Sequence, residues 1–457
     1  MYVVSPEFKA AVRTTHEISV RAEVWRGSQR LRSLEILDGA VDVDSRRAQR
    51  RTCTVRLAAP KPDVNLIPVF NIYQSLIGYG TYAALAIGYA TYAELQSISG
   101  YTEETVDDGL IPQTAFSDVT PFGNELRIWR GVKVAAPLHP TYASLMLMGL
   151  YSNLIIDFDT YGQMSQSVAT DDVFEEVPLG VFVMTEVNVK EDAKDASIEI
   201  IGVDRSMRIA RSLWVDPVGI VAGTSLSDAI GAVLANRWPD VETDLQSTAT
   251  TVPALTLGVQ GGSSSNPWND VQKIAEAGGL EVYFNNSGVV VLAAINDPTS
   301  KTPLETYVDG EDAMVLDVHR RLSTDQTYNG VVVTGEGTSV IPPVRAILFD
   351  EDPASPTYRY GAFGERPAFV SSPLVLTTAD AIAVAGAELS KIKGAEENVE
   401  WSQICDPSLD AGDVIKIRNE GTRLAKVLVL DKVTIPLSPT GSMKATARTV
   451  RVLVEGE

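Results

Sequence analysis

Paired carboxylates are the groups in this sequence that come nearest to a catalytic or metal-binding pattern. Two carboxylates held close together can bind a calcium ion, or they can serve as the acid and base of a glycoside hydrolase. Three such pairs occur in one region: Asp157 and Asp159, Asp171 and Asp172, and Glu175 and Glu176. The surrounding sequence lacks lysine and arginine, and acidic side chains are ordinarily solvated. We therefore expect solvent-exposed carboxylates here and keep a calcium site as the alternative.

The remaining reactive residues form no familiar catalytic or metal-binding motif. His16, His139 and His319 are far apart in the sequence, and Cys53 and Cys405 are too few for a disulfide framework. The sequence contains neither a GxxxxGK(S/T) phosphate-binding loop nor a GxSxG nucleophile motif. We therefore expect no catalytic residue, no metal ligand and no cofactor, and a role other than that of an enzyme.

Four arginines lie close together in the segment "SRRAQRR", between two predicted strands. They are Arg46, Arg47, Arg50 and Arg51. Clustered arginines can bind nucleic-acid phosphates, or they can pair with carboxylates of the same chain or of a neighbouring subunit. Because the whole chain is acidic, we favour a salt-bridged or subunit-facing edge and keep nucleic-acid contact as the alternative. Acidic stretches elsewhere in the chain are candidate partners.

The charge of the chain limits the kinds of partner it can have. The chain has 457 residues and a formal net charge of −21. Residues 62–126 hold eight acids and no base, and residues 134–189 hold seven acids and no base. Such a charge repels phosphates, so the protein is a poor candidate for gripping nucleic acid. It could still line a channel through which DNA passes without sticking.

Both base-free stretches carry a repeated Tyr-x-x-Leu motif, and successive tyrosines are nine or ten residues apart. At about 100° per residue, a step of ten turns the motif by roughly 280° around a helix. An odd step of nine moves it to the other face of a strand. We therefore expect each repeat to be a short unit that stacks on its neighbours and contacts other proteins. The predicted contact residues are Tyr73, Leu76, Tyr82, Leu85, Tyr92, Leu95, Tyr142, Leu145, Tyr151, Leu154, Tyr161 and Met164.

A run of thirty residues without charge, 64–93, lies inside the first of these stretches. It is long enough to span a bilayer. Its glycines, tyrosines and polar residues, and its periodicity, argue against one straight apolar helix. We favour a stacked arm for protein contact and keep reversible membrane contact and membrane spanning as alternatives.

The elements that would position these residues are mostly strands. Alternating apolar and polar residues predict strands in "EISVRAEVWRG", "RTCTVRLAAP" and "NELRIWRGVKV", and helical spacing predicts helices at 224–239 and 377–393. We expect a mainly β fold with an α/β insert. The expected parts are a first antiparallel β domain (1–63, 113–134 and 177–211), two repeat insertions within it (64–112 and 135–176), an α/β domain (212–304) and a second β domain with one helix (305–457).

Several segments resemble minor tail proteins from phages of actinobacteria. They include "MYVVSPEFKAAVRTTHEISVRAEV", "DGAVDVDSRRAQRRTCTVRLAAP", "FGNELRIWRG", "NPWNDVQKIAEAGGLEVYFNNSGVVVL" and "DPSLDAGDVIKI". The resemblance covers nearly the whole chain except the two insertions, and it rests on the order of the segments rather than on one motif. It implies a tail-tip or baseplate hub fold, in which each subunit contributes two tube-like β domains.

The resemblance also implies a structural role in the virion. We expect a homotrimeric hub ring at the tail tip that joins the tail tube to the tip and lines a channel for DNA during genome ejection. The expected partners are further copies of the chain, the distal tail or tail tube protein, the tape measure protein, other tail-tip proteins, and the host envelope during attachment. The alternatives are a hexameric distal tail adaptor ring and a tip protein that binds glycans or degrades the cell wall. We expect assembly in the host cytoplasm, since the N-terminal segment lacks the pattern of a secretory signal.

Removal of residues 66–110 is expected to leave the first β domain folded. Its flanking strands can still pair, and the entropy of loop closure depends only weakly on loop length. Circular dichroism and denaturant unfolding of the deletion variant check this, and an insoluble variant would contradict it. For Leu85→Asp we expect loss of partner binding rather than loss of folding.

Overall fold

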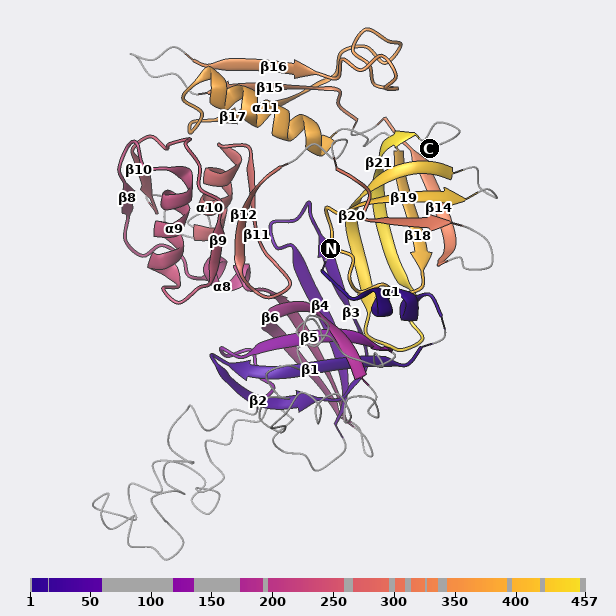
Figure 1. Cartoon of the computed structure of the whole chain (residues 1–457). Helices are drawn as coiled ribbons and strands as arrows, with labels where there is room; N and C mark the ends of the chain where they lie inside the picture. Colours follow the sequence, from indigo (N-terminus) through magenta and orange to yellow (C-terminus); the bar gives the residue numbers. More distant parts are fainter. Residues whose placement is uncertain are drawn as a thin grey trace, which may run out of the picture.

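The part of the chain that the structure describes forms four structural units, which Figure 1 shows in a computed structural model. The first β unit lies at the bottom of the view and the second β unit at the right. An α/β unit lies at the left, and a small unit around helix α11 lies at the top. The structure describes residues 2–14, 16–59, 118–134, 173–191, 196–258, 266–295, 301–308, 314–324, 327–335, 343–392, 397–419 and 424–452.

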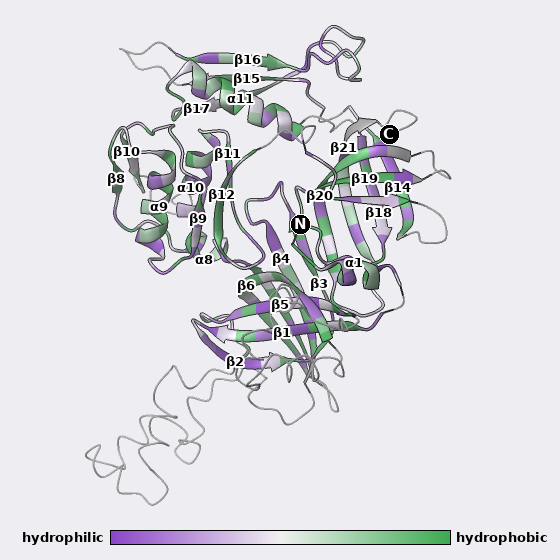
Figure 2. Ribbon diagram, viewed as in Figure 1, coloured by the Kyte–Doolittle hydropathy of each residue, from purple (hydrophilic) through white to green (hydrophobic). Residues whose placement is uncertain are grey.

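The first β unit is an antiparallel array of strands in which buried and exposed residues alternate, as the sequence predicts. In β4, Cys53, Val55 and Leu57 are buried whereas Thr54 and Arg56 are exposed. Figure 2 shows the resulting mixture of hydrophobic and hydrophilic residues along the strands. The strands are β1 (Ile18–Arg26), β2 (Gln29–Leu34), β3 (Ile36–Asp44), β4 (Arg51–Ala59), β5 (Glu125–Val134), β6 (Val173–Glu191) and β7 (Ala196–Asp204).

The second β unit continues the same sheet. Its strands are β13 (Glu305–Val308), β14 (Val315–Leu322), β18 (Glu397–Gln403), β19 (Val414–Asn419), β20 (Leu424–Pro436) and β21 (Met443–Val452). Strand β20 pairs antiparallel with β3, from Lys432 opposite Asp44 to Pro436 opposite Ala40. The strand order is β14-β18-β21-β20-β3-β4-β7-β6-β5-β1-β2, with β19 also pairing with β20 and β13 pairing with β19. Buried residues of both β units form one hydrophobic core.

Two residues show how closely the two β units approach each other. Gly39 has a φ of +152°, and a Cβ atom there would lie 2.3 Å from the backbone oxygen of Thr54 in β4 and 3.2 Å from Cδ1 of Leu437, which follows β20, so β3 requires glycine at this position. The carbonyl oxygen of Gly39 accepts a hydrogen bond from the backbone N–H of Leu437 at 2.9 Å. Arg130 of β5 is buried and donates hydrogen bonds to the carbonyl oxygens of Pro436 and Ser438. Hydrogen bonds from backbone groups and from a charged side chain therefore join the two β units where β20 pairs with β3. We call this place the seam.

The N-terminal helix α1 (Pro6–Val12) forms a second connection between the two β units. Its capping residue Ser5 donates through its backbone N–H to the carboxylate of Glu175 in β6 at 2.8 Å. The helix lies against β5. Lys9 of the same helix forms an ion pair with Glu305 of β13. The helix therefore links the first β unit to the second.

The α/β unit has its own core around two helices. The helix expected at 224–239 is present as α9, and Ser225 caps it by accepting a hydrogen bond from the backbone N–H of Asp228. In α10, Trp268 packs near Phe284 with ring centroids 5.5 Å apart. The elements are α8 (Ser206–Arg211), β8 (Val218–Ile220), α9 (Leu226–Arg237), β9 (Thr243–Leu245), β10 (Leu255–Leu257), α10 (Pro267–Glu276), β11 (Leu280–Phe284) and β12 (Val290–Ala294).

A further unit lies within the range expected for the second β domain. Three strands form a sheet that packs on α11, and buried residues such as Val331 and Ala385 give it a separate core. The helix expected at 377–393 is present, and the hydroxyl of Thr377 accepts a hydrogen bond from the backbone N–H of Asp380 at 3.1 Å. The elements are β15 (Gly330–Gly335), β16 (Arg345–Phe349), β17 (Pro367–Ser372) and α11 (Thr378–Ile392).

The two expected insertions leave the first β unit between β4 and β5 and between β5 and β6. Strand β6 begins at Val173, so it includes the last four residues of the range 135–176. The repeat residues from Tyr73 to Leu95 and from Tyr142 to Met164 lie outside the described residues. Within the described part of the chain, no helix is long and apolar enough to cross a membrane.

The variant Arg130→Met is expected to lower the free energy of unfolding by about 3 kcal/mol, because the carbonyl groups of Pro436 and Ser438 lose a buried charged donor. Denaturant unfolding of the full chain measures the change. The control is Arg56→Met, whose side chain is exposed and whose effect should stay within about 0.5 kcal/mol. Equal effects of the two variants would show that Arg130 does not hold the seam.

Candidate functional site

The turn between β3 and β4, residues 45–51, is the arginine loop. The backbone N–H of Asp44 donates to the carbonyl oxygen of Arg50 at 2.8 Å, and this hydrogen bond closes the loop. The carboxylate of Asp44 accepts from the backbone N–H of Arg46 at 3.0 Å. It also lies 3.5 Å from Nε of Arg46 and of Arg47. Asp44 therefore neutralises part of the positive charge of the loop.

One end of the arginine loop is bound to the second β unit. Both the backbone N–H and the hydroxyl of Ser45 donate to the carbonyl oxygen of Asp431, at 2.9 and 3.1 Å. The carboxylate of Asp431 forms an ion pair with Arg448 and lies 3.8 Å from the guanidinium of Arg46. Burial raises the pKa of Asp431, and the charges of Arg448 and Arg46 oppose this shift. The loop therefore extends the seam between β3 and β20.

The middle of the arginine loop contacts the α/β unit. The carbonyl oxygen of Ala48 accepts a hydrogen bond from the indole Nε1–H of Trp268 at 3.0 Å. The guanidinium of Arg50 lies over the ring of Tyr283, 4.0 Å from its centroid, in a cation–π contact. Its Nη1 is 3.6 Å from the carboxylate of Glu281. These contacts connect the α/β unit to the β sheet.

Arg51, the last residue of the cluster, is buried in the first β unit. Its Nη1 donates to the carbonyl oxygen of Leu179 at 2.9 Å, and its Nη2 forms an ion pair with Asp410. Its backbone N–H donates to the carboxylate of Asp204 at 2.9 Å. Burial favours the neutral form of Asp410, but the charges of Arg51 and Arg50 outweigh burial and lower the pKa of that carboxyl group.

The structure thus divides the four arginines into two pairs with different surroundings. The side chains of Arg50 and Arg51 are 7% and 3% exposed and make their contacts within the chain. Those of Arg46 and Arg47 are 53% and 60% exposed, which leaves more than half of each side chain open to solvent. A subunit contact through this loop stays a prediction, and Arg46 and Arg47 are the two side chains placed to make it.

The paired carboxylates of the sequence have separate partners where the structure describes them. Glu175 is only 3% exposed and accepts hydrogen bonds from Ser5, so the expectation of a solvated side chain is wrong for this residue. Glu176 forms an ion pair with Arg21 at 2.7 Å. The other two pairs lie outside the described residues. Among the described residues, no group of three or more His, Cys, Asp or Glu side chains could hold a metal ion.

The two cysteines are buried and unpaired. Burial raises the pKa of both thiols, that of Cys405 to about 12. A thiol that stays protonated is a weak nucleophile and a poor metal ligand. Cys53 and Cys405 therefore serve as small apolar residues of the core.

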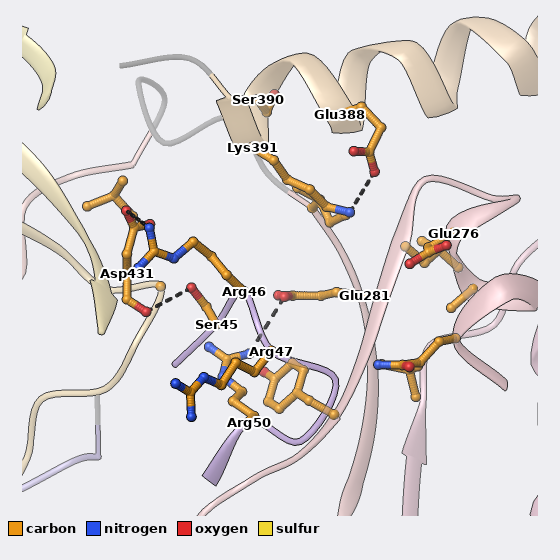
Figure 3. Close-up of a pocket in the computed structure, with 18 of the residues that line it drawn as sticks. Ser45, Arg46, Arg47, Arg50, Glu276, Glu281, Glu388, Ser390, Lys391 and Asp431 are labelled. Atoms are coloured by element: carbon orange, nitrogen blue, oxygen red, sulfur yellow. Dashed lines mark hydrogen bonds and ion pairs between the residues drawn. The ribbon is translucent and has the colours of Figure 1, made fainter. Parts of the chain in front are cut away.

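A cavity of about 600 Å³ opens between the arginine loop and the other units. Figure 3 shows side chains from the loop, from β11 and from α11 around it. The sequence shows that the arginines lie together but gives no sign of the cavity, because its other lining residues come from distant parts of the chain. The charged side chains that define it include Arg46, Arg50, Glu281, Lys301, Lys391 and Asp431.

The ion pair between Arg51 and Asp410 gives a prediction about pH. The pKa of Asp410 is lower in the folded chain than in the unfolded chain, so its carboxylate stabilises the fold above about pH 4. This stabilisation is lost as the pH falls through the folded-state pKa of Asp410. At pH 7 we expect Asp410→Asn to lower the free energy of unfolding by about 3 kcal/mol, because Arg51 keeps a buried charge without its partner.

The difference between the native chain and Asp410→Asn should shrink as the pH falls below about 4. Urea unfolding at several pH values measures this difference. The matched control is Glu199→Gln, which breaks the exposed pair with Arg56 and should cost less than about 1 kcal/mol. A difference between native chain and variant that does not change with pH would exclude the ion pair as its cause.

The structure is similar to solved structures of other proteins, whereas the sequence alone has no match. No protein-family model matches the sequence, and no curated protein matches it. The chain is similar to the tail protein from Neisseria meningitidis MC58, with a TM-score of 0.53, 10% identity, and coverage of 94% of this chain and 96% of that one. It is also similar to the 43 kDa tail protein of prophage MuSo2 from Shewanella oneidensis, with a TM-score of 0.52, 9% identity, and coverage of 94% and 98%. The chain therefore has the fold of these two tail proteins, and the predicted mainly β architecture is confirmed.

Proposed function

We propose that this chain is a structural component of a bacteriophage tail tip, where it forms a hub ring as a homotrimer. The observation that carries the proposal is its similarity in fold to two tail proteins over nearly the full length of all three chains. The ring joins the tail tube to the tip. The resemblance of the sequence to minor tail proteins of actinobacterial phages supports the same role.

The continuous sheet supports a ring built from three copies. Each chain supplies two β units at an angle fixed by the pairing of β20 with β3, so three chains supply six such units around an axis. Among the described strands of the sheet, β2, β13 and β14 each pair with one neighbour only, and β2 and β14 end the main strand order. Closing a ring covers such edges, which otherwise invite uncontrolled association.

Strand β14 carries exposed apolar side chains, as expected for a sheet edge that a neighbouring copy covers. Leu316 and Leu322 are 61% and 75% exposed, although both are apolar. Exposed apolar side chains gathered on one strand are typical of a contact surface. The edge of β14 is thus the proposed place of contact between copies.

The charge of the chain supports passage of DNA through the ring without binding. A net charge of −21 repels phosphates, and the most buried arginines of the arginine loop face carbonyl and carboxylate groups of the same chain. The two repeat insertions are proposed as arms that contact other tail-tip proteins or the host envelope. The tail tube, distal tail and tape measure proteins are the proposed neighbours along the axis.

Symmetry tests the proposal directly. We expect native mass spectrometry of the purified chain, and end-on images of assembled tails, to give three copies. A six-copy ring would favour the distal tail adaptor instead, and a monomer at high concentration together with a copy number that is not a multiple of three would exclude the hub.

A variant locates the contact. Leu322→Lys should weaken the trimer by about tenfold or more, because it places a charge in an apolar contact. The matched control is Val215→Lys, which changes an equally exposed apolar residue of the α/β unit and should leave the copy number unchanged. Equal behaviour of the two variants would exclude the edge of β14 as the interface.

A further inference from the structure

The cavity beside the arginine loop has features that a tail-ring role does not explain. We propose that it binds a small oxyanion, a ligand that carries phosphate or carboxylate groups. The cavity has a volume of about 600 Å³, which lies in the range of small-molecule sites. Figure 3 shows that its labelled side chains are almost all charged or polar.

The charges around the cavity are positive on balance, in contrast to the rest of the chain. Among the described residues that line the cavity, six are basic and four are acidic, and Asp44 behind them pairs with Arg46 and Arg47, so one positive charge remains in excess, whereas the whole protein has a net charge of −21. A local excess of positive charge in an acidic protein marks the place where an anion is attracted most strongly.

Three of the four acidic side chains in the described lining are engaged by basic groups, and Glu281 is one of them, since it lies 3.6 Å from Nη1 of Arg50. Glu388 forms an ion pair with Lys391 at 2.6 Å, and Asp431 forms one with Arg448. Lys301 is exposed, and it takes part in no ion pair among the described residues. The lining therefore retains a cation for an incoming anion.

Exposed arginine side chains in the lining point to the chemistry of the ligand. Arg46 and Arg47 both line the cavity, and their side chains are 53% and 60% exposed. Guanidinium groups only donate, and their planar fork matches the oxygens of phosphate and carboxylate. The bound group must accordingly be an acceptor with negative charge.

The dimensions and charge favour a small anion over a macromolecule. The basic groups lie within a cavity between units rather than along an open stripe, and the net charge of the chain repels a nucleic acid. The cavity is lined by the arginine loop, the α/β unit, α11 and the second β unit. A ligand there would bind the folded chain alone and stabilise the relative position of these units. The proposal does not depend on the trimeric ring.

Calorimetric titration of the full chain with inorganic phosphate, pyrophosphate and citrate tests the proposal, at constant ionic strength set with sodium chloride. We expect saturable binding of one anion per chain and a rise in the thermal unfolding temperature that chloride does not reproduce. Absence of saturable binding by the native chain would overturn the proposal.

Lys301→Ala should weaken binding by about tenfold, the effect of losing one charge-assisted contact. Lys190→Ala is the matched control, since Lys190 is also exposed but does not line the cavity. Equal binding by the two lysine variants would overturn the assignment. So would binding of an oligo-aspartate peptide or a DNA duplex without binding of the small anions.

Discussion

Backbone hydrogen bonds between β20 and β3 hold the two β units in one sheet, and the rest of the structure depends on this pairing. Each paired N–H and C=O group is satisfied, and two strand edges that would otherwise be open are covered. A shift of one residue would turn every side chain of a strand to the opposite face. The register from Lys432 to Pro436 therefore places apolar residues of both units in one core. The seam also explains why Arg130, on a strand of the first unit, is buried against carbonyl groups of the second.

The arginine loop adds a second constraint at the same place. It follows β3 directly, so the strand that forms the seam also positions Ser45 against Asp431. Its next residues contact Trp268 and Tyr283 of the α/β unit. One short turn thus connects units that have separate hydrophobic cores. The contacts are polar and cationic, as is common where separately packed units meet.

The two functional proposals rest on different parts of this arrangement. The ring depends on the continuous sheet, because a repeated assembly needs two β units at a constant angle. The oxyanion site depends on the cavity that remains where the loop, α11 and the α/β unit meet. A fold by itself does not determine a function, so each proposal relies on its own surface. The similarity to tail proteins concerns the fold and has no bearing on the cavity.

The sequence by itself determined the local structure of this protein. Apolar alternation predicts the strands of the first β unit, and capping residues such as Thr377 predict the positions of α9 and α11, because these signals act over a few residues. The sequence also showed that four arginines lie together and that the chain is acidic. Only the tertiary structure decided that Arg51 is buried beside Asp410 whereas Arg47 is exposed, and that Glu175 is an internal acceptor for Ser5. These outcomes depend on pairing between strands far apart in the chain. No local pattern encodes which edges meet, and the seam and the cavity exist only after they do.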